Sequence, residues 1–238
     1  MYELERDLVE DLKAGLATAL QPSLSSFLTT ELTLRTRVVD VAFAEAEDPR
    51  VAVTDWPDYA AGFRRLGAPH AALLAIIWQE KRISVDRLAR CTWSDARAIR
   101  HNYIDGMAKA RLIEVSSRGT VTPTSWANWS PGALIAVEAK LTDWRRAVVQ
   151  ATDHLEWADY SYIAMPSGGY LSRRDVRLSM REHGIGGLAV HPEDGVSLDV
   201  RARRSRKATG GRARVAINLL TNLSASDTRG SWRMSEAV

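Results

Sequence analysis

Leucine recurs at every fourth position near the start of the chain. A helix over residues 3–20 would gather these leucines into one apolar stripe, with charged residues on the other faces: Leu4, Leu8, Leu12, Leu16 and Leu20. Pro22 follows closely, and proline cannot continue a helix. The pattern predicts an amphipathic helix whose leucines pack against a core.

The next segment loses the helical period. Residues 34–44, LRTRVVDVAFA, are rich in β-branched and aliphatic side chains and predict a strand. The following stretch contains Pro49, Pro57 and Gly67, which interrupt regular structure. We therefore expect a looser connection there.

Residues 69–123 have the pattern of a self-contained module. Apolar periodicity predicts helices over 69–79, 83–91 and 92–112, the third of them beginning at a capping Thr92 or Ser94. Residues 113–124 predict a hairpin that turns at Ser117-Arg118-Gly119. Three helices followed by a hairpin resemble a winged helix-turn-helix.

Strand and helix patterns alternate after residue 130. The expected strands are 133–140, 160–166, 187–190 and 195–200, and the expected helices are 142–157 and 172–184. This alternation is typical of an α/β fold with the strands side by side in one sheet. We expect one domain from residues 1–66 and 126–214, an inserted module at 67–125, and a C-terminal tail at 215–238.

Composition limits the class of protein. The chain has 238 residues, of which 45% are hydrophobic and 26% are charged, values that are typical of a soluble globular protein and exclude a disordered one. Cys91 is its one cysteine, which excludes an internal disulfide and indicates a reducing, cytoplasmic compartment. The first residues do not resemble a signal peptide, and no apolar run is long enough to cross a membrane, so we expect no membrane partner.

Two opposite charges end the apolar strand at 133–140. Glu138 and Lys140 project from the same face of that strand, because side chains alternate along it. A buried carboxylate and ammonium are costly unless a partner compensates them, and a divalent cation would do so through hard oxygen ligands. Asp40 interrupts the strand at 34–44 in the same way and is the candidate second carboxylate.

Asp40, the Glu138-Ala139-Lys140 tripeptide and a following helix with Gln150 resemble the PD-(D/E)XK nuclease superfamily. The resemblance implies a restriction-endonuclease-like fold, a central mixed sheet flanked by helices, with the winged helix inserted. It implies that Asp40 and Glu138 hold Mg²⁺ or Mn²⁺. It also implies that Lys140 orients or deprotonates the attacking water and stabilises the developing phosphorane charge.

Further roles follow from the same resemblance. Gln150 would support the site or contact a phosphate, and Glu5 of the first helix would add a carboxylate. The 98 positions between Asp40 and Glu138 exceed the usual short connection of the family, and the inserted module accounts for most of the excess.

A structural interpretation of the charges remains open. An E-x-K tripeptide alone is uninformative, and Glu138 and Lys140 would then pair with each other, or with Asp143, at a solvated strand end. His154, one turn beyond Gln150, is interpreted as a packed helix residue.

Basic residues indicate a nucleic-acid partner. On the third module helix Arg97, Arg100 and His101 lie opposite Ile99, Tyr103 and Met107, on the face that a recognition helix would turn to DNA. The candidates elsewhere are Arg118 at the hairpin turn and a cluster of cations near the C-terminus: Arg203, Arg204, Arg206 and Lys207. The alternative is that these are ordinary solvated side chains.

The patterns together predict a Mg²⁺-dependent endonuclease that hydrolyses DNA phosphodiester bonds, with the winged helix as its DNA-binding part. The alternative is a catalytically inactive nuclease-like protein that binds DNA or regulates it. A protein-recruiting adaptor is a third possibility. Nucleases of this kind often cut both strands as homodimers, so a dimer is possible.

Overall fold

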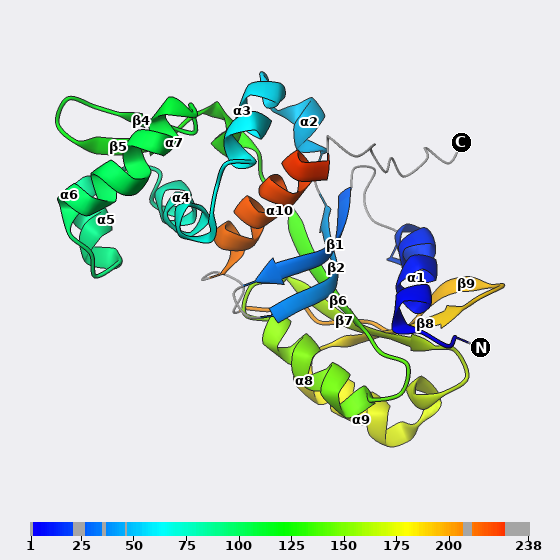
Figure 1. Cartoon of the computed structure of the whole chain (residues 1–238). Coiled ribbons are helices and arrows are strands. Elements are labelled where there is room, and N and C mark those ends of the chain that lie inside the picture. Colours follow the sequence, from blue (N-terminus) through cyan, green and yellow to red (C-terminus); the bar gives the residue numbers. More distant parts are fainter. Residues whose placement is uncertain (1, 21–26, 35–36, 46, 207–210, 227–238) are drawn as a thin grey trace. The chain divides into compact units, whose positions relative to one another are not determined.

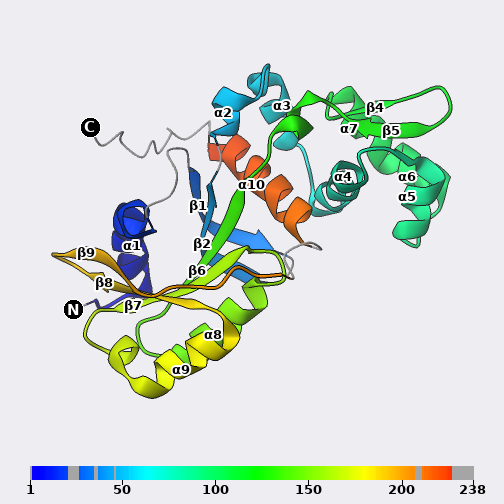
Figure 2. The ribbon, with the colours of Figure 1, turned by 180° about the vertical axis from the view of Figure 1, so that it is seen from behind.

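A computed structural model of the chain describes residues 2–20, 27–34, 37–45, 47–206 and 211–226. The chain divides into two compact units (Figures 1 and 2). The first comprises residues 1–46 and 131–212, and the second comprises residues 47–130 and 213–238. Each unit is described by itself below.

A mixed β-sheet forms the centre of the first unit (Figure 1). Its described strands lie in the order β1-β2-β6-β7-β8-β9. β6, β7 and β8 are parallel to one another, and the remaining pairs are antiparallel. Their bounds are β1 (Phe27–Leu34), β2 (Arg37–Glu45), β6 (Ala133–Ala139), β7 (Tyr160–Pro166), β8 (Gly186–His191) and β9 (Gly195–Val200). The expectation of an α/β fold with a mixed sheet flanked by helices is confirmed at this level.

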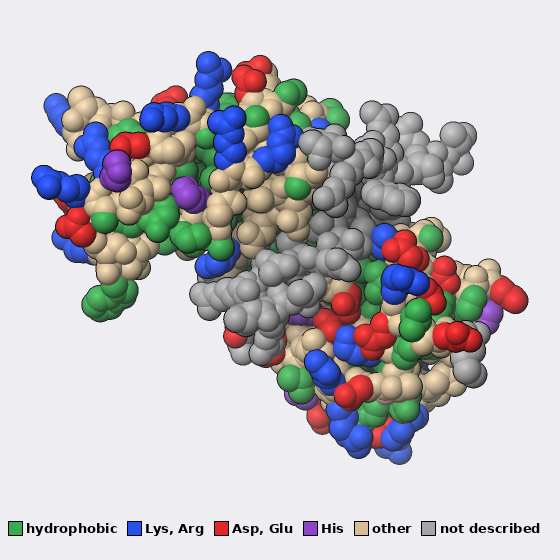
Figure 3. All heavy atoms as spheres, viewed as in Figure 1, with side chains coloured by type: hydrophobic (Ala, Val, Ile, Leu, Met, Phe, Trp, Pro, Cys, Tyr) green, Lys and Arg blue, Asp and Glu red, His purple; other side chains and the backbone are tan. Residues whose placement is uncertain are grey.

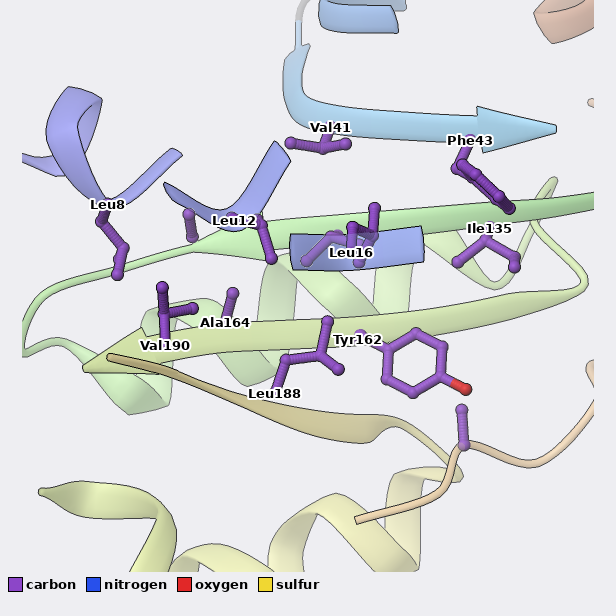
Figure 4. Packing of buried hydrophobic residues seen from close by; sticks show 13 residues of the cluster. Leu8, Leu12, Leu16, Val41, Phe43, Ile135, Tyr162, Ala164, Leu188 and Val190 are labelled. Atoms are coloured by element: carbon purple, nitrogen blue, oxygen red, sulfur yellow. The ribbon is translucent and has the colours of Figure 1, made fainter. Parts of the chain in front are cut away.

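Helices cover both faces of this sheet. α1 (Glu5–Leu20) packs Leu8, Leu12 and Leu16 on one face, where all three are fully buried (Figure 4). On the other face, α8 (Trp144–His154) and α9 (Arg174–His183) form a second apolar layer. A short 3₁₀ turn, η3 (Tyr170–Ser172), leads into α9. The leucine stripe is therefore what holds α1 on the sheet.

β7 shows why the central strands are mostly apolar. Tyr162 and Ala164 belong to the layer beneath α1, whereas Ile163 and Met165 belong to the layer beneath α8 and α9. Successive side chains alternate between faces, and both faces are covered, so apolar side chains are favoured on each. Opposite Tyr162 the sheet needs glycine, because a Cβ on Gly186 would lie 2.3 Å from the tyrosine ring.

The N-terminal elements differ in part from the expectations. The helix begins at Glu5, and Leu4 is 52% exposed, so the apolar stripe starts one turn later than expected. The strand expected at 34–44 is β2, and a further strand, β1, pairs with its outer edge. The alternation in FLTTELTL is short and polar, and for this reason the sequence pattern did not distinguish it from a loop.

The second unit combines short helices with a small antiparallel sheet, ordered β3-β5-β4. Its strands are β3 (Ile83–Ser84), β4 (Ile113–Val115) and β5 (Thr120–Pro123). Its helices are α2 (Pro49–Ala52), α3 (Trp56–Phe63), α4 (Ala68–Glu80), α5 (Val85–Cys91), α6 (Ala96–Ile99), α7 (Asp105–Lys109) and α10 (Arg212–Ser226), with a π-helical turn η1 (Arg100–Ile104) and a 3₁₀ turn η2 (Ser125–Asn128). The three expected helices and the hairpin all have counterparts here.

The boundaries of this unit differ from the expected module. Residues 47–66 belong to it, because Phe63 of α3 stacks edge-on against Trp126. Residues 213–226 continue α10 rather than a tail, with buried side chains Val215, Ala216, Ile217, Leu219 and Leu220. An apolar face at helical spacing in 215–220 was the signal that the sequence interpretation left out.

The third module helix is shorter than expected and contains a π turn. It runs from Ala96 to Lys109, with η1 in its middle. Ile99 and Met107 are buried as expected, but Ile104 is fully buried in place of the half-buried Tyr103. A π turn adds one residue to the helical repeat, so the buried position moves one place along the chain.

Candidate functional site

Three carboxylates surround the ammonium of Lys140 at the end of β6. Nζ of Lys140 lies 2.9 Å from Oε1 of Glu138, 3.4 Å from Oε2 of Glu5 and 3.7 Å from Oδ2 of Asp40. It also donates a 2.9 Å hydrogen bond to the carbonyl oxygen of Ala139. Four of the five expected catalytic residues are therefore brought together, from three separate segments of the chain.

Strand register places Asp40 beside Glu138. β2 and β6 pair antiparallel with Val41 opposite Val137, so the next positions along the two strands are residues 40 and 138. Val41 and Val137 both lie in the core beneath α1, and alternation turns Asp40 and Glu138 to the opposite face. Had the register slipped by one residue, the two acids would lie on different faces.

Backbone and helix contacts fix the remaining geometry. The N–H of Ala139 donates a 2.8 Å hydrogen bond to Oδ2 of Asp40, which holds that carboxylate against the end of β6. Glu5 is the first residue of α1, so packing of the α1 leucines brings its carboxylate to the same end of the sheet. Lys140 continues the pairing with β7 through its N–H to Ala164.

Burial dominates the electrostatics of this cluster. Glu138 is 1% exposed, and burial raises the pKa of its carboxyl, with the neighbouring charge of Asp40 raising it further. Burial likewise raises the pKa of Asp40, against the hydrogen bond from Ala139 and the charge of Lys140. For Lys140, burial lowers the pKa, but its hydrogen bond to Glu138 and the acid charges outweigh this and raise it, so the amine stays protonated.

His154 extends the site on the α8 side. It is 3% exposed, and its Nε2 lies 3.9 Å from Oε2 of Glu138. Its ring centroid is 5.6 Å from that of Trp157. Sequence reasoning interpreted this histidine as a packed residue, and packed it is. Its proximity to the acid became visible only when α8 was placed against β6.

Gln150 does not join the carboxylates. It lies one turn before His154 on α8, and its Oε1 is buried without a hydrogen-bond partner in the described part of the chain. At this position it faces the same layer as His154. Among the described residues, no hydrogen bond of the Gln150 Oε1 therefore supports the role expected for this residue.

The cluster fits a divalent cation in two respects. Three ionised carboxylates against one ammonium leave a formal charge of −2 within the contacts of Lys140. Oε2 of the buried Glu138 accepts no hydrogen bond from any described residue. Mg²⁺ is typically bound through one or two carboxylates, with water and substrate phosphate as its other ligands. Among the described residues no group of three or more His, Cys, Asp or Glu side chains is arranged to hold a metal.

The expected nucleic-acid-binding side chains are exposed wherever they are described. In the second unit these are Arg97, Arg100, His101 and Arg118. Figure 3 shows Lys and Arg side chains spread over this unit, with acidic side chains among them. In the first unit Arg203 and Arg206 are exposed, as is Arg204. Lys207 lies outside the described residues.

Arg204 has a structural partner. Its guanidinium lies 3.2 Å from Oδ1 of the buried Asp159, whose other oxygen pairs with Arg212 and accepts the N–H of Leu134 at 2.9 Å. Burial raises the pKa of Asp159, but these hydrogen bonds and guanidinium charges outweigh it and hold the pKa below its ordinary value. This ion-pair cluster anchors the segment after β9 to the start of β6.

Comparison with protein-family models, with curated proteins and with solved structures gave no match. Among the described helices, none combines the length and apolar character needed to cross a membrane. The assignment of function therefore depends on the geometry of the site itself.

Proposed function

We propose that the first unit is a metal-dependent nuclease site that hydrolyses phosphodiester bonds, as in the PD-(D/E)XK superfamily. One observation carries the proposal: Asp40 of β2 converges with Glu138 and Lys140 at the end of β6. Glu138 is buried, and its Oε2 accepts no hydrogen bond from any described residue. A buried acid of this kind is unfavourable in a purely structural role, because an unsatisfied buried acceptor costs about 1–3 kcal/mol.

The residues have separable roles in this mechanism. Asp40 and Glu138 would bind Mg²⁺ or Mn²⁺, and the ion would supply Lewis-acid polarisation of the scissile phosphate. Lys140, protonated and 12% exposed, donates hydrogen bonds toward the same site, where it positions a water molecule and offsets negative charge on the phosphorane. Glu5, which is half-exposed, supplies a further acceptor for that water on the solvent side.

The second unit would serve as the DNA-binding part. Its helices α5 and α6–α7 and its β4–β5 hairpin have the layout of a winged helix-turn-helix, and Arg97, Arg100 and Arg118 stand exposed on it. Exposed arginines suit phosphate contact because the guanidinium binds phosphate oxygens bidentately.

One observation favours an alternative, a nuclease-like protein that binds DNA without cutting it. The ammonium of Lys140 contacts all three carboxylates, which makes a closed ion-pair cluster from the groups that a metal would need. If that cluster is permanent, the site binds no metal and the second unit alone accounts for function. Isothermal titration calorimetry with Mn²⁺ distinguishes the two proteins, since only the nuclease requires that the site bind the metal.

Cleavage of plasmid and oligonucleotide DNA with Mg²⁺ or Mn²⁺ tests the proposal directly. Lys140→Met and Asp40→Asn proteins should each lose cleavage by about 100-fold or more, while DNA binding in EDTA stays unchanged. Lys13→Met is the matched control, because Lys13 on α1 pairs with Glu10 away from the cluster. Absence of cleavage by the unaltered protein with every metal and DNA form would leave the binding protein as the function.

A further inference from the structure

One tryptophan of the second unit differs from the others in its surroundings. Trp93 is 97% exposed, whereas five others are at most 8% exposed: Trp56, Trp78, Trp126, Trp129 and Trp157. Trp144 is half-buried on α8, and Trp232 lies outside the described residues. An indole left in water forgoes the burial that makes tryptophan stabilising elsewhere in this chain.

The backbone holds Trp93 in a conformation that favours glycine. It follows α5 with a φ of 53°, in the left-handed region. The N–H of Ser94 bonds to the carbonyl of Ala89 at 3.0 Å, and the N–H of Trp93 approaches the carbonyl of Arg90 at 3.4 Å. These two bonds define a Schellman motif with Trp93 at the position that glycine usually occupies. Because an L-residue is strained there, fold stability does not explain the tryptophan.

Side-chain hydrogen bonds hold the backbone on both sides of the turn. Oγ1 of Thr92 donates to the carbonyls of Leu88 and Ala89 at 3.0 and 3.1 Å. On the other side, Oδ1 of Asp95 accepts the N–H groups of Arg97 and Ala98, which begins α6. An indole on a fixed turn loses little conformational freedom when a flat ligand stacks on it.

Cations flank the indole along the chain. Arg90 stands three residues before it and Arg97 four residues after it, and both are exposed. Arg100 and His101 continue the exposed basic face in the following turn. Acids are present too: Asp86 is exposed on α5, and Asp95 is held by the amide groups of α6. An aromatic face among cations suits a polyanion that carries flat rings, which is the chemistry of a nucleic acid.

We propose that Trp93 is a stacking site for an unpaired nucleobase. In a duplex the faces of each base are covered by its neighbours, so a projecting indole can stack only on a base that is unpaired or at an end. The second unit therefore prefers nucleic acid with single-stranded character, with Arg90 and Arg97 at its phosphates. The inference depends on the proposed function only in that both take a nucleic acid as ligand.

Binding in EDTA tests the site without any cleavage. The ligands are a labelled 20-nucleotide single strand and the matching duplex, in which only the two terminal pairs expose a base face. Binding is measured by fluorescence anisotropy with the whole chain. Trp93→Gly should weaken single-strand binding about 10- to 100-fold and duplex binding less than about threefold. Trp93→Phe should keep most of the affinity, whereas Trp93→Leu, apolar but without a π face, should bind as weakly as Trp93→Gly.

Stability provides the decisive second readout. Because glycine suits the left-handed turn, Trp93→Gly should leave the Tm unchanged or raise it by roughly 2–4 °C while binding falls. The slope of binding against salt should stay constant, since phosphate contacts remain. Val51→Ala, at a side chain 75% exposed in the same unit, is the matched control and should change neither.

Two results would overturn the inference. Single-strand binding that is equal in the unaltered protein and in the Trp93→Gly and Trp93→Leu variants would exclude a base at this position, and a protein partner would then be the occupant. Equal losses for single strand and duplex would exclude the preference for unpaired bases. If binding depends on Trp93 but the protein cleaves no nucleic acid, the stacking site stands and the proposed nuclease is refuted. If the protein cleaves but binding does not depend on Trp93, the nuclease stands and the stacking site is refuted.

Discussion

Replacing Glu138 by glutamine separates a metal site from a structural ion pair, because the two roles predict opposite changes in stability. Glutamine keeps the shape of the side chain and removes its charge. If Glu138 serves only to pair with Lys140, 2.9 Å away, then breaking that buried pair should cost about 3–5 kcal/mol. If Glu138 is a metal ligand, then in the metal-free protein its ionised form is itself the destabilising group.

The structure gives the size of that destabilisation. Oε2 of Glu138 is buried without a hydrogen-bond donor among the described residues, which costs about 1–3 kcal/mol. Since Lys140 Nζ is 2.9 Å from Oε1 of Glu138 and 3.7 Å from Oδ2 of Asp40, these oxygens are at most about 6.6 Å apart. Their repulsion is at least about 2.5 kcal/mol at an effective dielectric constant of about 20. The charge of Lys140 opposes this repulsion, but burial and the charge of Asp40 together still raise the pKa of the Glu138 carboxyl, so its neutral form is favoured. We expect Glu138→Gln to raise the free energy of unfolding by about 1–2 kcal/mol at pH 8.

The pH dependence follows from the direction of the pKa shift. Burial, with the charge of Asp40, raises the pKa of Glu138 above its ordinary value of 4.5, so the folded state binds the proton more tightly than the unfolded chain. The stability that this proton contributes is fully present below pH 4.5 and is lost as the pH rises through the raised pKa. The advantage of the glutamine variant should therefore vanish near pH 4 and be greatest at pH 8.

Urea unfolding at pH 4, 6 and 8, with and without Mn²⁺, is the assay. At a Mn²⁺ concentration of about 100 times its Kd, the unaltered protein should gain about 2.7 kcal/mol and the variant should gain nothing. Asp159→Asn is the control: its carboxyl is also buried but has a lowered pKa, so its loss should destabilise at pH 8 and matter less as the pH falls. A Glu138→Gln protein that loses about 3 kcal/mol at pH 6 and 8 and still responds to Mn²⁺ would refute the reasoning.

Three further substitutions test the site and the sheet. Lys140→Met should abolish cleavage, yet its affinity for Mn²⁺, measured by calorimetry, should be at least that of the unaltered protein, because the change removes a cation and no metal ligand. Weaker Mn²⁺ binding would contradict this. His154→Phe should weaken Mn²⁺ binding about 10- to 100-fold, because the ring that lies 3.9 Å from Glu138 loses its polar atoms; unchanged affinity would show that the histidine only packs. Gly186→Ala should lower the free energy of unfolding by about 1–3 kcal/mol in urea, because its Cβ meets an aromatic ring at 2.3 Å. Gly106→Ala, with nothing within 4 Å, should be neutral or stabilising, and equal effects of the two would refute the packing argument.

Local patterns determined several elements of this protein. The leucine spacing indicated α1, the apolar runs indicated β6 and β7, and the helices and hairpin of the second unit were visible in their periods and breakers. These features depend on which side chains must be buried, and alternation along one element is enough to reveal that. The same alternation showed that Glu138 and Lys140 share a face.

Tertiary structure decided what periodicity does not encode. The pairing of β1 with β2, the assignment of residues 47–66 and of α10 to the second unit, and the π turn all depend on partners distant in sequence. The approach of His154 to Glu138 is of the same kind.

Residue types and their alternation are enough to show which side chains of this chain are chemically able to form a site, and on which face of each strand they lie. That residues 40 and 138 meet depends on the fold, because the two residues are 98 positions apart and their distance is set by the register of the strands that carry them. That register is set by the packing of Val41 and Val137 beneath α1. The free energy of this packing comes from contacts among many core residues, so the sequence of one segment does not reveal it.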